Sequence, residues 1–265
     1  MSTGSRGVGI RLSLGARAEV VPRDDGEVIV TLDGAESDAP VTRAVASIMA
    51  PGTGFDISID NDLPVSQGFG MSAAGAIAAG LAIADVTGMS RSEAFAAAHV
   101  AEVRCGGGLG DVSAIVGGRD VPIRTVAGLP PYGAVRNAGF KIPRITLAVL
   151  GPVMETGDVL ADPRRMEAVR DAAADTLDGF IADPTYENLF EASNRFSRET
   201  GLESPHMSEV LDGLRSRGFH AGMCMLGNSV YTDAPEEVLW SMLGRGHVRT
   251  FRCSSSHREA IVQRV

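Results

Sequence analysis

The stretch PVSQGFGMSAAGA, residues 64–76, combines two glycines around Phe69 with a serine and the start of an alanine-rich run. The preceding residues 55–62 (FDISIDND) alternate apolar and acidic side chains, which predicts a strand, and residues 72–86 predict a helix that ends at Gly88. Backbone N–H groups in such a loop can approach an anion, and the positive end of the helix dipole adds to the attraction. A tight turn into a closely packed helix is the alternative interpretation of the same small residues.

The composition of the chain excludes several classes of protein. A net charge of −9 is unfavourable for nucleic-acid binding, which requires clustered positive charge. Lys141 is the only lysine and no GK[ST] motif is present, so a Walker-type nucleotide site is excluded. Residues 2–15 lack the apolar core of a signal peptide, residues 73–84 are too few to span a bilayer, and the three cysteines form no CxxC pair. We therefore expect a cytoplasmic protein without nucleic-acid or membrane partners.

A second glycine-rich segment, CGGGLGDV at 105–112, follows a predicted helix. His99 and Glu102 are three residues apart and share one face of that helix, and Asp111 follows Glu102 by nine residues. Carboxylates beside glycine loops suit a site where Mg²⁺ bridges phosphate oxygens, or where a hydroxyl must lose its proton. Two glycine loops together with Ser72, Glu102 and Asp111 therefore indicate a functional phosphate site rather than two unrelated turns.

The pattern of predicted elements is that of an α+β protein. Residues 15–32 predict a β-hairpin that turns at 24–26, and residues 219–232 predict two strands joined by a two-residue turn at Gly227–Asn228. The proline- and glycine-rich segment 129–135 (LPPYGAV) marks the expected boundary between two domains. Further helices are expected near 91–104 (with a capping box of Ser90 and Glu93), 163–181, 185–200, 206–217 and 236–243, and further strands at 121–126, 145–150 and 247–253. Because the helices are grouped rather than strictly alternating with strands, the class is α+β.

Several motifs together resemble the GHMP kinase superfamily. PVSQGFGMSAAG is similar to the phosphate-binding motif of these kinases, Pro-x-x-x-Gly-Leu-Gly-Ser-Ser-Ala, and within the superfamily the chain most resembles the archaeal pantoate kinase family. The resemblance covers most of the chain through GSRGVGI, HVAEVRCGGGLGDV, GLPPYG, LAVLGPVMET, NRFSRETGL and AGMCMLGNSVY. It implies the GHMP kinase fold, with a ribosomal-S5-like, ATP-binding amino-terminal domain (1–135) and a ferredoxin-like carboxy-terminal domain (136–265).

The resemblance also implies an activity, the ATP-dependent phosphorylation of pantoate to 4-phosphopantoate in coenzyme A biosynthesis. Asp111 would be the catalytic base or orienting carboxylate, and Ser72 and Glu102 would hold Mg²⁺ against the ATP phosphates. The phosphate loop would comprise Gly68, Phe69, Gly70, Met71, Ser72 and Ala73. The pantoate pocket would draw on Ser5, His99, Arg124 and Thr156. An arginine suits the carboxylate of pantoate because a guanidinium pairs with it through two hydrogen bonds.

Two departures from the family pattern leave alternatives open. Met71 stands where the superfamily usually has the first of two serines, and the Pro-x-His-Ile strand that relatives usually carry ahead of GSRGVGI is not seen, which leaves one wall of the site open to question. Homoserine, mevalonate or shikimate kinase activity would use the same loops, and a non-catalytic GHMP-fold ligand sensor is a further alternative. The joint presence of Ser72, Glu102 and Asp111 favours an enzyme. Dimers are common in the superfamily, so a homodimer stays open.

Overall fold

The computed structural model describes residues 1–153 and 163–263, so the predicted substrate residue Thr156 lies outside the described residues. The strands are β1 Gly7–Val8, β2 Ala16–Arg23, β3 Val28–Leu32, β4 Ala35–Glu36, β5 Gly54–Asn61, β6 Pro122–Val126, β7 Ala134–Asn137, β8 Ile145–Val149, β9 Ala221–Met223, β10 Ser229–Thr232 and β11 Arg249–Cys253. The helices are α1 Pro40–Met49, α2 Met71–Thr87, α3 Arg91–Arg104, α4 Asp111–Gly117, α6 Pro163–Ala182, α7 Tyr186–Glu199, α8 Pro205–Arg215 and α9 Glu236–Leu243. Within the described residues no helix is long and apolar enough to cross a membrane.

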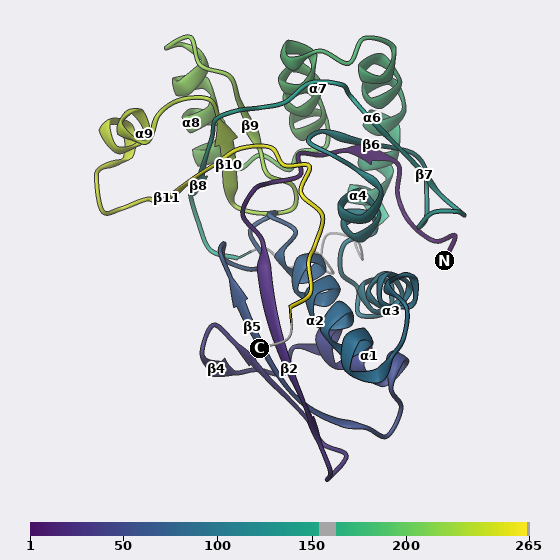
Figure 1. The fold of residues 1–265 in the computed structure, drawn as a ribbon. Coiled ribbons are helices and arrows are strands. Elements are labelled where there is room, and N and C mark those ends of the chain that lie inside the picture. Colours follow the sequence, from purple (N-terminus) through teal and green to yellow (C-terminus); the bar gives the residue numbers. More distant parts are fainter. Residues whose placement is uncertain (154–162, 264–265) are drawn as a thin grey trace.

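The amino-terminal sheet has the strand order β2-β5-β3-β4 and is covered by α1 and α2, on which α3 packs (Figure 1). The predicted hairpin of residues 15–32 is wrong: β5 lies between β2 and β3, antiparallel to the first and parallel to the second. The physical reason is burial, because Phe55, Ile57 and Ile59 alternate along β5 and are at most 1% exposed. A central position gives this strand two hydrogen-bonded neighbours and lets its apolar face pack beneath the helices.

Helix α2 is built from small and apolar residues and is buried along most of its length. It begins after Gly70 and ends at Gly88, and both glycines adopt left-handed backbone angles, which confirms the predicted helix to within one residue. An ideal Cβ on Gly80 would lie 3.2 Å from the Ala94 carbonyl oxygen of α3. The small residues therefore let α2 and α3 pack closely, and α3 itself starts with the predicted Ser90–Glu93 capping box.

A small sheet of order β1-β6-β7 and the short helix α4 lie above α3 in the view of Figure 1. Strand β6 pairs with β1 at one edge and with β7 at the other, all antiparallel. This arrangement brings the chain start near the glycine-rich segment that precedes α4, because Ser5 N donates to the Leu109 carbonyl at 3.2 Å. Strand β7 runs across the proposed domain boundary at 135, which stays a proposal.

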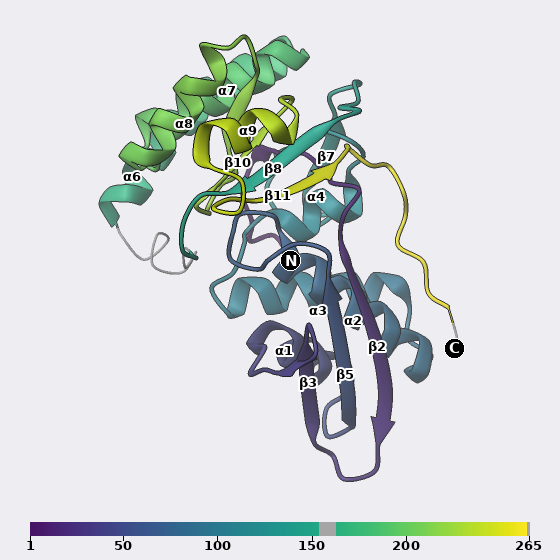
Figure 2. The same cartoon turned by 90° about the vertical axis from the view of Figure 1, so that its left-hand side faces the viewer.

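The carboxy-terminal sheet is antiparallel with the order β11-β8-β10-β9. Helices α6, α7 and α8 connect β8 to β9 and lie together on one side of the sheet, as Figure 2 shows. Helix α9 connects β10 to β11, so the half has the ferredoxin-like βαββαβ order. Strands β9 and β10 pair as predicted, but residues 224–228 join them instead of a two-residue turn. The predicted α+β class is confirmed.

Candidate active site

The first glycine loop shapes an anion-binding helix terminus. Gly68 and Gly70 have φ angles of 76° and 68°, which glycine adopts without the penalty that a Cβ brings. Helix α2 starts directly after Gly70, and no side chain caps its first turn within the described part of the chain. Since the Ala74 N–H is the first to bond back, to the Gly70 carbonyl at 3.0 Å, the earlier N–H groups face outward with the positive end of the helix dipole. This terminus can therefore bind a phosphate.

Glu102 connects the two glycine loops. Its Oε1 accepts a hydrogen bond from Ser72 Oγ, in the first turn of α2, and its Oε2 accepts one from the Gly108 N–H at 2.9 Å. The side chain is only 1% exposed. Burial raises the pKa of the Glu102 carboxyl and the charge of Asp111 adds to that, whereas the hydrogen bonds from Ser72 and Gly108 act in the opposite direction.

The second glycine loop leaves room for two carboxylates. An ideal Cβ on Gly108 would lie 2.5 Å from Asp111 Oδ2 and 3.7 Å from Glu102 Oε2, so both carboxylates converge on this glycine. An ideal Cβ on Gly70 would lie 3.9 Å from Asp111 Oδ2, so Asp111 also faces the first loop. The structure therefore brings Ser72, Glu102 and Asp111 together at the start of α2, and their catalytic and metal-binding roles stay predictions.

Asp111 and Arg124 each affect the pKa of the other, next to Ser72 and Glu102. Burial raises the pKa of Asp111, and the nearby Arg124 guanidinium partly opposes that rise. Burial likewise lowers the pKa of Arg124, and Asp111 opposes that change. Both groups are partly buried, so each charge is poorly solvated and is stabilised by the opposite charge of the other.

Arg124 lies in a slot between the chain start and the second loop. Its Nε donates to the Ser5 carbonyl at 3.1 Å, and its Nη2 lies 3.5 Å from Ser5 Oγ. A side chain on either Gly7 or Gly110 would collide with the guanidinium, so only glycine fits on these two sides of the slot. Ser5 and Arg124 are thus neighbours, as the predicted substrate pocket requires.

His99 lies one helical turn before Glu102 and is 2% exposed. Its Nε2 is 2.9 Å from the Thr3 carbonyl oxygen. Because a carbonyl can only accept, Nε2 carries the hydrogen and donates it. Burial lowers the pKa of His99, and the bond to Thr3 opposes that change. The neutral ring therefore holds the chain start against α3, next to the segment that carries Ser5.

Other contacts of the first loop were not predicted. Phe69 packs edge-on against Phe251 of β11, with ring centroids 6.5 Å apart. Gln67 is bonded to Ser229 of β10 and to Gly151, which follows β8. These contacts join residues far apart along the chain, so no local spacing pattern could have predicted them. The one signal in the sequence was that GNSVY, which contains Ser229, was among the segments that carried the family resemblance.

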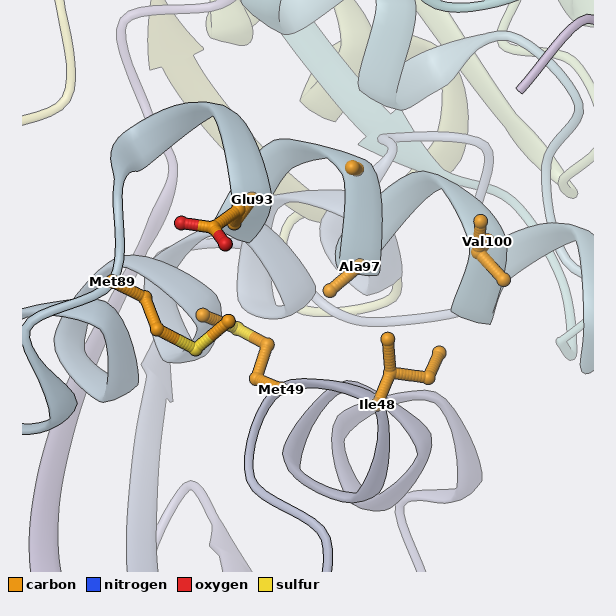
Figure 3. A pocket seen from close by; sticks show the side chains of 7 residues that line it. Ile48, Met49, Met89, Glu93, Ala97 and Val100 are labelled. Carbon is orange, nitrogen blue, oxygen red and sulfur yellow. The ribbon is translucent and has the colours of Figure 1, made fainter.

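A separate pocket of about 230 Å³ lies between α1 and α3 (Figure 3). It is lined by Ile48, Met49, Met89, Glu93, Ala96, Ala97 and Val100. Its one carboxylate, Glu93, already accepts hydrogen bonds from the backbone and side chain of Ser90 in the capping box. This pocket therefore offers apolar contacts and no free group for acid–base chemistry. Among the described residues no group of three or more His, Cys, Asp and Glu side chains is arranged to hold a metal on its own.

Comparison with known proteins identifies related sequences. Residues 39–119 match the family model for the GHMP kinases N terminal domain. A pantoate kinase of Thermococcus kodakarensis is 30% identical over 66% of this chain and 58% of the relative, and one of Methanocaldococcus jannaschii is 25% identical over 90% of this chain and 87% of the relative. The match thus spans little more than half the length of the first of these relatives.

The fold also matches solved structures. A structure described as a phosphotransferase related to the CoA biosynthesis pathway superposes with a TM-score of 0.85 at 24% identity, over 96% of this chain and 88% of the other. The match includes both halves of the molecule, so the expected GHMP kinase architecture is confirmed. Residues 39–119 thus match the GHMP kinase N-terminal domain, and the chain has the fold of the GHMP kinases.

Proposed function

We propose that this chain is a pantoate kinase, which transfers the γ-phosphoryl group of ATP to the terminal hydroxyl of pantoate and yields 4-phosphopantoate for coenzyme A biosynthesis. The observation that carries the proposal is the convergence of Ser72, Glu102 and Asp111 on the open amino terminus of α2. The names of the two relatives support pantoate as the acceptor. We propose a cytoplasmic location from the sequence features described above, and a homodimer from the family resemblance alone.

The donor set at this terminus fits a nucleotide with Mg²⁺. In the proposed complex the backbone of 68–73 would cradle the phosphates. Ser72 Oγ and Glu102 Oε1, two hard oxygen donors already within contact of each other, would hold the metal. The ion would supply positive charge that neutralises the phosphates. Two protein oxygens are enough for Mg²⁺, because this ion is usually held by one or two protein ligands and completed by phosphate and water.

Asp111 is the proposed proton acceptor or orienting group for the hydroxyl. As the hydroxyl oxygen bonds to the γ-phosphorus and the bond to ADP breaks, the Asp111 carboxylate takes the hydroxyl proton. Its raised pKa favours this role, because a base is most effective when its pKa lies near the working pH.

Arg124 is the proposed anchor for the carboxylate of pantoate. The guanidinium is held by Ser5 on one side, in a slot that Gly7 and Gly110 leave open, and such a fixed fork can bind a carboxylate through two hydrogen bonds. Ser5, His99 and Thr156 complete the proposed pocket. His99 acts in it by holding residues 1–5 in place through Thr3.

The decisive experiment is an ADP-release assay with Mg-ATP and four acceptors: pantoate, homoserine, mevalonate and shikimate. Turnover confined to pantoate is the expected result, and turnover with another acceptor would reassign the substrate. No turnover with any of them, together with measurable ATP binding, would favour the ligand sensor.

Arg124→Ala tests the pocket directly, and Arg136→Ala is a matched control because Arg136 is exposed on the neighbouring strand β7. We expect only Arg124→Ala to raise the KM for pantoate, by about tenfold or more for the loss of a charged hydrogen-bonded pair. An unchanged KM would remove Arg124 from the pocket.

A further inference from the structure

The residue before the first glycine of the phosphate loop is tied to the carboxy-terminal sheet. The Gln67 side chain is 4% exposed. The backbone carbonyl oxygen of Gln67 accepts a hydrogen bond from Ser229 Oγ at 2.5 Å, and its side-chain Nε2 donates to the Gly151 carbonyl at 3.1 Å. Ser229 opens β10, and Gly151 follows the neighbouring strand β8. Two adjacent strands of the other half of the molecule therefore hold one residue of the loop.

The backbone of the 224–228 loop packs against the backbone of Gln67 and Gly68. An ideal Cβ on Gly68 would lie 2.5 Å from the Cys224 carbonyl oxygen, and one on Gly227 would collide with the backbone of Gln67. The 224–228 loop is itself held by the Cys224 N–H, which donates to the Ser229 carbonyl at 2.9 Å, and by the Gly227 N–H, which donates to Cys224 at 3.0 Å. The phosphate loop thus packs against a hydrogen-bonded loop of the carboxy-terminal half.

Glycines at positive φ do not hold a conformation by themselves, because they also populate many other backbone angles. A phosphate cradle, in contrast, must present its N–H groups in one arrangement before the ligand arrives. We propose that Ser229 and Gln67 are positioning residues, which set the conformation of the phosphate loop from the carboxy-terminal sheet. The kinetic part of this inference rests on the proposed kinase function.

Strand β10 offers a matched pair of variants. Ser229→Ala removes the hydroxyl that bonds to Gln67, whereas Thr232→Val removes one at the other end of the same strand. Thr232 Oγ1 donates to the His220 carbonyl at 2.6 Å and also accepts from the Ala234 N–H at 3.1 Å. Both residues are buried. The control therefore loses at least as many hydrogen bonds as the test, but none of them reaches the phosphate loop.

Hydrogen exchange of the free protein tests the positioning role without catalysis. We expect Ser229→Ala to speed exchange of peptide 64–74 by about tenfold, because the Gln67 carbonyl loses its buried donor and local opening becomes more frequent. Thr232→Val should leave exchange of that peptide as in the wild type. Gln67→Ala, which removes the bond to Gly151, should also speed it. Unchanged exchange in Ser229→Ala and Gln67→Ala, or an equal rise in Thr232→Val, would overturn the inference.

Steady-state kinetics separate a positioning role from a general loss of stability. Ser229→Ala and Gln67→Ala should raise the KM for ATP by about tenfold and leave the KM for pantoate unchanged. A fall in active enzyme concentration alone would lower kcat and leave both KM values unchanged, and that result would contradict the inference. If the wild type shows no turnover, the proposed function fails while the exchange measurement still decides the role of Ser229.

Discussion

The two glycine-rich segments, 68–70 and 106–110, look alike in the sequence but are glycine-rich for different physical reasons. In the first, Gly68 and Gly70 have positive φ, and the space beside Gly68 is filled by the backbone of Cys224. In the second, Gly106 also has positive φ, but Gly107, Gly108 and Gly110 leave space for charged side chains. These side chains are Glu102, Asp111 and Arg124. The first segment needs glycine for its backbone conformation and close backbone contact, whereas the second needs glycine to leave space for the charged side chains of the site.

Glycine-rich loops of similar sequence can therefore serve different structural purposes. A side chain added to the first segment should disturb the shape that receives phosphate. A side chain added to the second should displace a carboxylate or the guanidinium and leave that shape intact. The two segments therefore predict separable kinetic effects.

The largest effect should come from the carboxylate that the second segment accommodates. Asp111→Asn keeps the shape of the side chain but removes its ability to take a proton, so kcat should fall by roughly 10² to 10⁴. Asp171→Asn, on the exposed face of α6, is the control. A kcat within a factor of a few of the wild type would exclude Asp111 as the base.

Gly110→Ala probes the second segment through Arg124. The added Cβ would meet the guanidinium, so the side chain must move out of its slot. We expect the KM for pantoate to rise by about tenfold, the loss of roughly one charged hydrogen bond, while the KM for ATP stays near the wild-type value. Steady-state kinetics with each substrate varied in turn measure this.

Gly68→Ala is the counterpart in the first segment. It combines a left-handed backbone angle, which costs a residue with a Cβ about 1–2 kcal/mol, with a contact against the Cys224 carbonyl. The KM for ATP should rise, again by about tenfold, and the KM for pantoate should not. If both glycine variants impaired the same substrate, the proposed difference between the segments would be wrong.

The carboxylate of Asp111 also predicts that stability depends on pH. Because burial raises the folded-state pKa of Asp111, ionising it costs stability as pH rises from about 4, the ordinary pKa of aspartate, through that raised value. Asp111→Asn removes this cost. Its unfolding free energy without nucleotide should equal that of the wild type in acid and exceed it at neutral pH. Denaturant unfolding from pH 4 to 8 should show this difference in unfolding free energy between the variant and the wild type increase with pH. A difference that decreased with rising pH would contradict the raised pKa of Asp111.

The smallest effect should come from the helix that separates the two segments. Ser90→Ala removes the capping box of α3, far from Glu102 at its other end. The free energy of unfolding should fall by about 1 kcal/mol, and both KM values should stay unchanged. A change in kinetics would mean that the start of α3 is coupled to the site.

Local patterns accounted for much of the fold but not for the pairing of its strands. The capping box and the glycines around α2 are short-range features, and the structure has both helices close to their predicted ends. Helix α1 was not predicted, and its start lacks a side-chain cap. The hairpin at 15–32 was wrong because the strand that separates β2 from β3 comes later in the chain, and its burial is decided only when α1 and α2 cover the sheet.

The sequence by itself determined the two glycine loops, the helices that follow or precede them, and the residue types of the candidate site, because each depends on neighbours within a few positions. Only the tertiary structure decided that Ser72, Glu102 and Asp111 meet, that Arg124 lies between Gly7 and Gly110, and that Ser229 holds Gln67 from 162 positions away. Such contacts form between segments that the fold brings together, and no local spacing encodes them.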